Sequence, residues 1–188
     1  MQDVRYTLSF EGISALIMNS NAALFAPEDK GRDPAKYELE HFREKAYTDG
    51  AGGLVIPARC IKKMAVDACK FYPKKPKGTN FKSFGPFIQA ATIVPTDAPL
   101  GVRIDAVRPF PLIVNLDPSK GSKGPRGPRT RPMLPPGWKA QADLIVFDPI
   151  LTIEHLSEIF ERGGKQVGLL DGRAIDFGRC LITIKLAA

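Results

Sequence analysis

Residues 54–71 read LVIPARCIKKMAVDACKF, a short apolar strand that runs directly into an amphipathic helix. Leu54–Ile56 form the strand, and Pro57 suits the entrance of the helix, where a backbone N–H group would have no helical partner. The helix is expected over about 58–71. Apolar residues at spacings of three and four give it one buried face, formed by Ile61, Met64, Ala65 and Ala68.

Strand patterns stand on both sides of this segment. Apolar residues occupy every second position from Val4 to Phe10, as in a half-buried strand, and the apolar stretch 13–18 extends it beyond a bend at Gly12. Further strands are expected at 87–94, 102–116, 140–147 and 180–186. Pro109 and Pro111 mark an edge or a break in the second of these.

Two more helices are expected. The segment KYELEHFREKAY (36–47) carries a loose apolar stripe and ends before the glycine-rich stretch 49–53. The other helix covers Ile153–Arg162. Thr152 caps it, with His155 where a capping box would place glutamate, and Gly163-Gly164 stop it.

The order of these elements indicates the fold class. Strand, helix and strands, followed by strand, helix and strand, is typical of an α+β protein. We expect a ferredoxin-like or RRM-like βαββαβ unit, in which an antiparallel sheet has helices on one face. Residues 1–188 would form a single domain with basic insertions at 70–82 and 117–137.

Positive charge is concentrated in two short tracts. Residues 119–131 (SKGSKGPRGPRTR) and 70–82 (KFYPKKPKGTNFK) hold ten of the 27 basic residues and none of the 20 acidic ones. The rest of the chain therefore has 17 basic and 20 acidic residues, although the net charge is +7. A tract this rich in glycine, proline and charge cannot bury apolar surface, so 119–131 is expected to project as a mobile loop. The tracts suit the phosphates of a nucleic acid, and the alternative is a pair of solubilising loops.

No constellation of catalytic residues is recognisable. His41 and His155 have no metal-ligand partner at a recognisable spacing, and the chain lacks HExxH, GxSxG and GxxxxGK[ST] patterns. Cys60, Cys69 and Cys180 form no CxxC pair, and no function is assigned to them. We therefore expect no metal, no cofactor and no enzymatic activity.

The composition is that of an ordinary globular protein, with 44% apolar and 25% charged residues. No apolar stretch approaches the roughly 20 residues that span a bilayer. The N-terminal residues show no signal-peptide pattern. A cytoplasmic protein without a membrane partner is the expectation.

Two segments resemble the RAMP superfamily, the RRM-fold subunits of CRISPR effector complexes that include Cas7-like and Cas5-like proteins. Ile56, Pro57 and Ala58 match the strand-to-helix junction of that family, and Lys62 and Lys63 match its basic helix start. Residues 163–179 (GGKQVGLLDGRAIDFGR) resemble the glycine-rich loop that follows its last helix. The matching positions are Gly163, Gly164, Gly168, Gly172, Gly178 and Arg179. The combination also resembles small phage-borne and metagenomic proteins.

The resemblance implies a modified RRM fold that binds RNA and polymerises along it. Some Cas7-like subunits cut bound RNA with an aspartate in a loop comparable to 19–35, which makes Asp33 the weak catalytic candidate here. Glu28 and Asp29 belong to the same carboxylate cluster. The other interpretation is that Glu28 and Asp29 are solvated and that Asp33-Pro34 starts a turn or helix.

From these features we predict a non-catalytic protein that binds the backbone of single-stranded nucleic acid, RNA in preference to DNA, and that assembles as a homo-oligomer or filament. The residues expected to contact nucleic acid are Arg59, Lys62, Lys63, Lys74, Lys75, Lys77, Lys120, Lys123, Arg126, Arg129, Arg131, Lys165, Arg173 and Arg179. Other interpretations stay open. The helix cations also fit a solvated face, and the glycine-rich loop also fits a helix stop in which Asp171 and Asp176 pair with Arg173 and Arg179.

Aromatic residues accompany the basic tracts. Phe71, Tyr72 and Phe81 are candidates for stacking on bases, whereas Trp138 is expected in the core at the start of a strand. Two rival functions remain. One is a structural or adaptor protein, such as one of phage origin, that docks an acidic partner. The other is an RNA endonuclease that uses Asp33.

Overall fold

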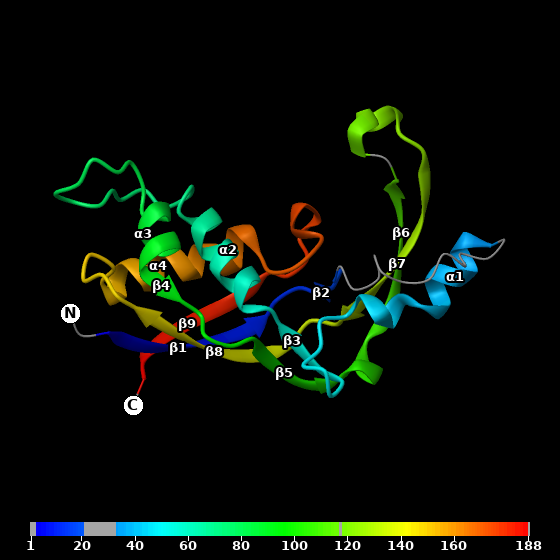
Figure 1. The fold of residues 1–188 in the computed structure, drawn as a ribbon, viewed down its shortest axis with the longest axis horizontal. Coiled ribbons are helices and arrows are strands. Elements are labelled where there is room, and N and C mark those ends of the chain that lie inside the picture. The colour runs from blue at the N-terminus through cyan, green and yellow to red at the C-terminus, as the bar shows by residue number, and fades with distance from the viewer. Residues whose placement is uncertain (1–2, 21–32, 117, 188) are drawn as a thin grey trace.

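A four-stranded antiparallel sheet forms the body of the protein in the computed structural model, which describes residues 3–20, 33–116 and 118–187 (Figure 1). The strand order is β4-β8-β1-β9. The strands are β1 (Val4–Gly12), β4 (Thr92–Ile93), β8 (Lys139–Val146) and β9 (Cys180–Leu186). Because β1 and β4 both run antiparallel to β8 between them, the chain forms the split βαβ arrangement of ferredoxin-like folds.

Three helices cover one face of this sheet (Figure 1). They are α2 (Ala58–Ala68), α3 (Gly85–Ala91) and α4 (Ile153–Arg162). The predicted apolar face of α2 is fully buried, and α4 contributes Leu156, Ile159 and Phe160 to the core that also holds the sheet residues Leu8 and Leu144. Thr152 caps α4 as expected, since its side chain accepts the N–H of His155. The α+β fold class predicted from the sequence is confirmed.

Two smaller sheets continue from the body. One has the order β2-β7-β6, and the other pairs β3 with β5. Their strands are β2 (Leu16–Ile17), β3 (Gly53–Ile56), β5 (Ala98–Arg103), β6 (Arg108–Asn115) and β7 (Arg126–Leu134). The β6–β7 hairpin rises from this end on the same side as the helices (Figure 1). Pro109 and Pro111 lie on the edge strand β6, as predicted.

The expected mobile loop at 119–131 is wrong for half of its length. Residues 126–134 form strand β7, and Pro118–Lys123 form a 3₁₀ turn that closes the hairpin. Glycine and proline suit a strand here because of where they fall. Pro128 pairs with Ile113 at a position whose nitrogen turns away from β6, and a Cβ at Gly127 would lie 2.7 Å from Leu116 Cδ1. The composition predicted a loop because it carries no information on this register.

Residues 87–94 were expected as a strand, and this expectation is wrong except at β4. Gly85–Ala91 form helix α3, with Pro86 in its first turn. At its end the Thr92 hydroxyl donates to the Ile88 carbonyl at 2.6 Å. A short apolar run fits a buried helix as well as a strand, and the Gly-Pro start decides between them. The strand expected at 102–116 is interrupted by a 3₁₀ turn at Ile104–Ala106.

One expected helix has different boundaries. The helix at 36–47 is instead α1 (Pro34–Glu40) followed by a 3₁₀ turn at Phe42–Lys45. α4 ends at Arg162 with Gly163 as its C-cap, as predicted, and a π-helical turn follows over Gly163–Val167. A Cβ at Gly164 would lie 2.2 Å from the Cys180 carbonyl oxygen, so this glycine serves close packing on β9. Within the described residues, no helix is long and apolar enough to cross a membrane.

Candidate nucleic-acid interface

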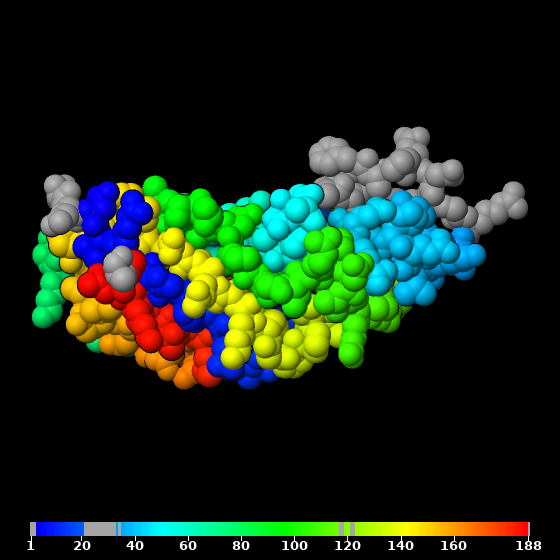
Figure 2. Space-filling model, turned by 90° about the horizontal axis from the view of Figure 1, so that it is seen from below, coloured from blue at the N-terminus to red at the C-terminus, as the bar shows by residue number. Residues whose placement is uncertain are grey.

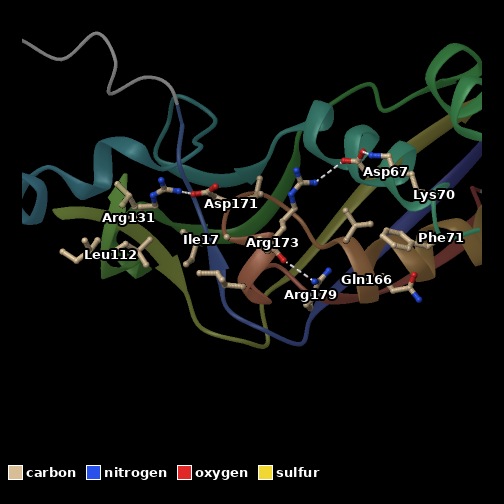
Figure 3. Close-up of a pocket in the computed structure, with 17 residues that line it drawn as sticks. Ile17, Asp67, Lys70, Phe71, Leu112, Arg131, Gln166, Asp171, Arg173 and Arg179 are labelled. Carbon is tan, nitrogen blue, oxygen red and sulfur yellow. Dashed lines mark hydrogen bonds and ion pairs between the residues drawn. The ribbon is translucent and has the colours of Figure 1, made fainter. Parts of the chain in front are cut away.

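A groove of about 830 Å³ opens between α2, the β6–β7 hairpin and residues 163–179, which we call the glycine loop (Figure 3). Side chains from elements far apart in sequence meet in it. Lys70 and Phe71 follow the end of α2, Arg131 comes from β7, and Arg173 and Arg179 come from the glycine loop. The apolar part of its wall includes Leu112, Ile113, Val114 and Ile175.

A second hollow of about 470 Å³ adjoins the groove over the first half of α2. Arg59, Lys62 and Lys63 line it, and it shares Leu170 and Arg173 with the groove. The two hollows therefore form one surface, which is lined by seven basic and two acidic side chains. A positive surface in a concave site attracts a polyanion.

Asp67 organises the cations between the two hollows. Its carboxylate lies 2.9 Å from Lys63 Nζ, 3.0 Å from Lys70 Nζ and 3.6 Å from Arg173 Nη1 (Figure 3). Burial alone would raise the pKa of Asp67, but the hydrogen bonds from Lys63 and Lys70 outweigh it and lower the pKa. One carboxylate thus holds three cations in place and leaves the cluster with excess positive charge.

Arg179 is held by its own loop. Its Nη2 donates to the Arg173 carbonyl at 3.2 Å and lies 3.3 Å from Asp176 Oδ1. The predicted pairing of Asp176 with Arg179 is therefore confirmed. Arg179 Nη1 is buried and has no hydrogen-bond partner in the structure. Arg179 also lines the groove, so its charge acts on an anion bound there.

The glycines of the loop are required by its backbone. Gly168, Gly172 and Gly178 have φ of +80°, +71° and +71°, and L side chains rarely adopt such values. At Gly178 a Cβ would lie 2.0 Å from the Leu169 carbonyl oxygen. The loop therefore folds tightly on itself, and this folding fixes where Arg173 and Arg179 lie.

The hairpin is tied to the rest of the molecule by its own cations. Arg131 pairs with Asp171 of the glycine loop (Figure 3), so Asp171 is not the partner of Arg173 that the sequence suggested. Arg129 Nη1 lies 3.0 Å from Glu38 Oε1, and Glu38 also pairs with Lys45. Both arginines thus have structural contacts within the protein.

The remaining predicted cations lie outside the groove. Lys74, Lys75 and Lys77 are exposed in the segment between α2 and α3, which we call the lysine loop (71–84) and which extends from the opposite end of the helix layer (Figure 1). Lys74 pairs with Glu158. Lys120, Lys123 and Arg126 lie at the end of the hairpin away from the body, and Lys165 pairs with Glu161 at 2.6 Å.

Six of the predicted cations consequently meet in the two hollows. They are Arg59, Lys62, Lys63, Arg131, Arg173 and Arg179. Lys62 Nζ also donates to the Thr92 carbonyl at 2.7 Å, and Arg59 lies over the Tyr47 ring. Lys70 was not singled out from its tract, although it lines the groove. Its position at the end of α2, one turn after Asp67, was the available signal.

Some of the aromatic candidates are buried in the core and others are exposed. Trp138 is buried and its Nε1 donates to the Ser14 carbonyl at 2.9 Å, which confirms the core interpretation. Tyr72 is buried against Phe84. Phe71 and Phe81 are each 52% exposed, and of these Phe71 lines the groove.

Asp33 is the cap of α1. Its Oδ1 accepts the backbone N–H groups of Ala35 and Lys36 at 3.0 and 3.2 Å, so Asp33-Pro34 does start a helix. Glu28 and Asp29 lie outside the described residues. Within residues 3–20, 33–116 and 118–187, no group of three His, Cys, Asp or Glu side chains is placed to hold a metal ion.

The outward positions of the four-stranded sheet are mostly polar. Thr7, Ser9, Gln141, Asp143 and Thr183 lie there. Sheets of RRM domains bind RNA by stacking bases on outward aromatic residues. The outward positions of the described β1, β4, β8 and β9 hold no aromatic residue, so the helix side of the molecule is the better candidate.

Comparison with known proteins identifies the fold. No protein-family model and no curated protein matches the sequence. A chain in the cryo-EM structure of the type III-B Cmr-beta bound to cognate target RNA is similar, with a TM-score of 0.58 and 12% identity. The match covers 100% of this chain and 62% of that one, so the chain spans about three fifths of that neighbour. Cmr6 from Pyrococcus furiosus has a TM-score of 0.51 and 12% identity, over 96% of this chain and 99% of that one.

Both neighbours are Cmr proteins, and the first belongs to a type III-B assembly bound to its target RNA. At this level of identity the likeness establishes the fold, and the RAMP-like, RRM-like fold implied by the sequence resemblance is the fold that is found.

Proposed function

We propose that this chain is a RAMP-type subunit that binds single-stranded RNA along its phosphodiester backbone without cleaving it. The observation that carries the proposal is the surface formed by the two hollows, where seven basic side chains from α2, β7 and the glycine loop converge. Contacts to phosphate give affinity but little sequence readout. Phe71, exposed beside the groove, supplies one stacking surface for a base.

RNA is proposed as the ligand in preference to DNA. Support comes from the neighbour whose structure contains cognate target RNA. Lys74, Lys75, Lys77, Lys120, Lys123 and Arg126 stay in the proposal as outlying cations that attract the strand before it enters the groove.

The test is a salt series of binding to single-stranded RNA and DNA. Arg173→Ala and Arg179→Ala should each weaken RNA binding by about fivefold and reduce the slope of log K against log salt by about one. Lys139→Ala and Lys185→Ala make the same charge change on the outer side of the sheet and should have little effect. Equal losses in both pairs of variants would show that the groove is not the binding surface.

The hairpin is proposed to contact a neighbouring copy, so that copies follow one another along the RNA. Its end projects from the body and carries Lys120, Lys123 and Arg126. Electron micrographs with and without a long oligonucleotide test this assembly. A strictly monomeric complex would contradict it.

A second candidate function is docking of an acidic protein, because the groove combines apolar residues of β6 with cations. Absence of any oligonucleotide binding at low salt would favour that function. RNA cleavage by Asp33 is tested by incubating labelled RNA with divalent metal. Only cleavage that Asp33→Ala abolishes would replace the non-catalytic proposal.

A further inference from the structure

Strand β9 forms an open edge of the main sheet. It pairs with β1 on one side over seven residues and is last in the strand order. In the described parts of the chain, no strand pairs with its other side. Figure 2 shows β9 (red) beside β1 (blue) on the sheet face, and Leu181 and Leu186 are 46% and 67% exposed.

Two backbone hydrogen bonds show which backbone groups face this edge. The N–H of Ala187 donates to the Arg5 carbonyl at 2.9 Å, and the N–H of Ile13 donates to the Arg179 carbonyl at 2.8 Å. Odd-numbered residues of β9 therefore turn their backbone groups toward β1. Since these directions alternate along an antiparallel strand, Ile182, Ile184 and Leu186 present their N–H and C=O groups outward.

The outer edges of the β6–β7 hairpin, in contrast, cannot readily pair with another strand. On β6 the N–H of Leu116 donates to Pro125, so the outward positions are odd-numbered, and Pro109 and Pro111 occupy two of them. On β7 the outward positions are even-numbered. Pro128 has no N–H group there, and the N–H of Thr130 donates to Glu38 Oε2 at 3.1 Å. At Pro132 strand β2 covers the edge, since the Pro132 carbonyl accepts the N–H of Met18 at 3.0 Å.

Proteins usually protect a strand edge that is not meant to pair, most often with proline, charge or a cover. Three prolines, Glu38 and strand β2 protect the hairpin in this way. The sequence of β9, CLITIKL, has no proline and one charge, although β9 is nearly as long as the hairpin strands. The difference indicates that the β9 edge has a partner strand.

We propose that this partner is β9 of a second copy, paired antiparallel about a two-fold axis at Thr183. An isologous contact needs a self-complementary surface, and in CLITIKL an isoleucine flanks the central threonine on each side. In this register Ile182 lies opposite Ile184, and residues 181–185 pair, whereas Cys180 is fully buried with Gly164 packed against its carbonyl and stays outside the contact. The same register places the outward backbone groups of both strands in hydrogen-bonding positions, because even-numbered residues face even-numbered residues.

Side-chain pairs across the axis also fit. Thr183 lies opposite its own copy, a favourable cross-strand pair. Leu181 lies opposite Lys185, whose methylene chain can cover it. The result is an eight-stranded sheet with both helix layers on one face, so the two grooves open on the same side. The contact is closed and does not itself extend into a filament.

Disulfide trapping tests the register directly. Thr183 forms a pair without hydrogen bonds across the axis, where Cα atoms are about 4.5 Å apart, within reach of a disulfide. In a Cys60→Ser background, Thr183→Cys should convert most of the protein to a covalent dimer under mild oxidation. Leu181→Cys is the matched control, since the two copies of position 181 are about 14 Å apart in this register. Monomer at position 183, or equal dimer at both positions, would overturn the proposal.

Mass measurements without RNA provide a second test. The natural chain should sediment as a concentration-dependent dimer. Ile184→Pro removes an outward N–H group and no intrachain hydrogen bond, so it should yield a folded monomer. A natural chain that is monomeric at every concentration would overturn the proposal. Because neither test involves nucleic acid, failure here leaves the RNA proposal standing, and failure of RNA binding leaves the dimer standing.

Discussion

The cations of the groove and the cations of the lysine loop differ in how the fold holds them. In the groove, Asp67 gathers Lys63, Lys70 and Arg173 within 3.6 Å, and a tightly folded backbone fixes Arg179. In the lysine loop, Lys74 pairs with Glu158, whereas Lys75 and Lys77 are exposed. A fixed cation can contact one phosphate in a defined geometry, whereas an exposed one mainly adds to the long-range field. Charge density in the sequence therefore marks attraction, and fixed geometry marks the site.

Two glycines provide the strongest test of this difference between fixed and exposed cations. Gly178 in the glycine loop and Gly78 in the lysine loop both have φ of +71°. A Cβ at Gly178 would lie 2.0 Å from a backbone oxygen, while at Gly78 nothing lies within 4 Å. Gly178→Ala should reduce the free energy of unfolding by roughly 3 kcal/mol and abolish binding in the groove. Gly78→Ala should cost about 1 kcal/mol, from its backbone conformation alone.

Chemical denaturation of both variants, followed by RNA titration of the folded fraction, measures the two effects. If Gly178→Ala binds RNA as well as Gly78→Ala does, the geometry of the glycine loop is unimportant and the distinction between fixed and exposed cations fails.

Arg129 provides a second test. It belongs to a basic tract in the sequence, but in the structure it is held in a network of ion pairs. Glu38 is buried and contacts Arg129, Lys45 and the N–H of Thr130. Glu38→Gln should leave these cations poorly paired and reduce the free energy of unfolding by about 2 kcal/mol, since Arg129 keeps some contact with water. Urea unfolding at neutral pH measures the loss, and Glu40→Gln on the exposed side of α1 is the matched control.

The same carboxylate predicts a pH dependence. Burial alone would raise the pKa of Glu38, but hydrogen bonds from Lys45 and Thr130, together with the charges of Lys45 and Arg129, lower it. A lowered folded-state pKa adds stability above the unfolded value of about 4.3, and this stability is lost as the pH falls through the folded-state pKa. The natural chain should therefore lose its advantage over Glu38→Gln in acid. A difference that stays constant down to pH 3 would contradict this assignment.

Local patterns in the sequence predicted the elements whose structure depends on neighbouring residues. The cap at Thr152 and the spacing of apolar residues located α4 at Ile153–Arg162, and the buried face of α2 was predicted residue by residue. The hairpin was missed because the prolines of β7 are compatible with a strand only in one register, which depends on β6. The groove was missed for a related reason. Lys70, Arg131 and Arg173 lie far apart in sequence, and only the path of the hairpin and the glycine loop brings them together.

The smallest expected effect comes from the lysine loop itself. Changing Lys75, Lys77 and Lys82 together to serine should slow association with RNA at low salt and lower the affinity at about 150 mM salt by no more than about threefold, because exposed charges are screened over a Debye length near 8 Å. Stopped-flow association at two salt concentrations separates this effect from a change in dissociation. Since the three lysines are exposed, the fold should be unchanged. A tenfold faster dissociation would mean that the lysine loop contacts the RNA strand directly. The lysines of the 70–82 tract would then belong to the binding site.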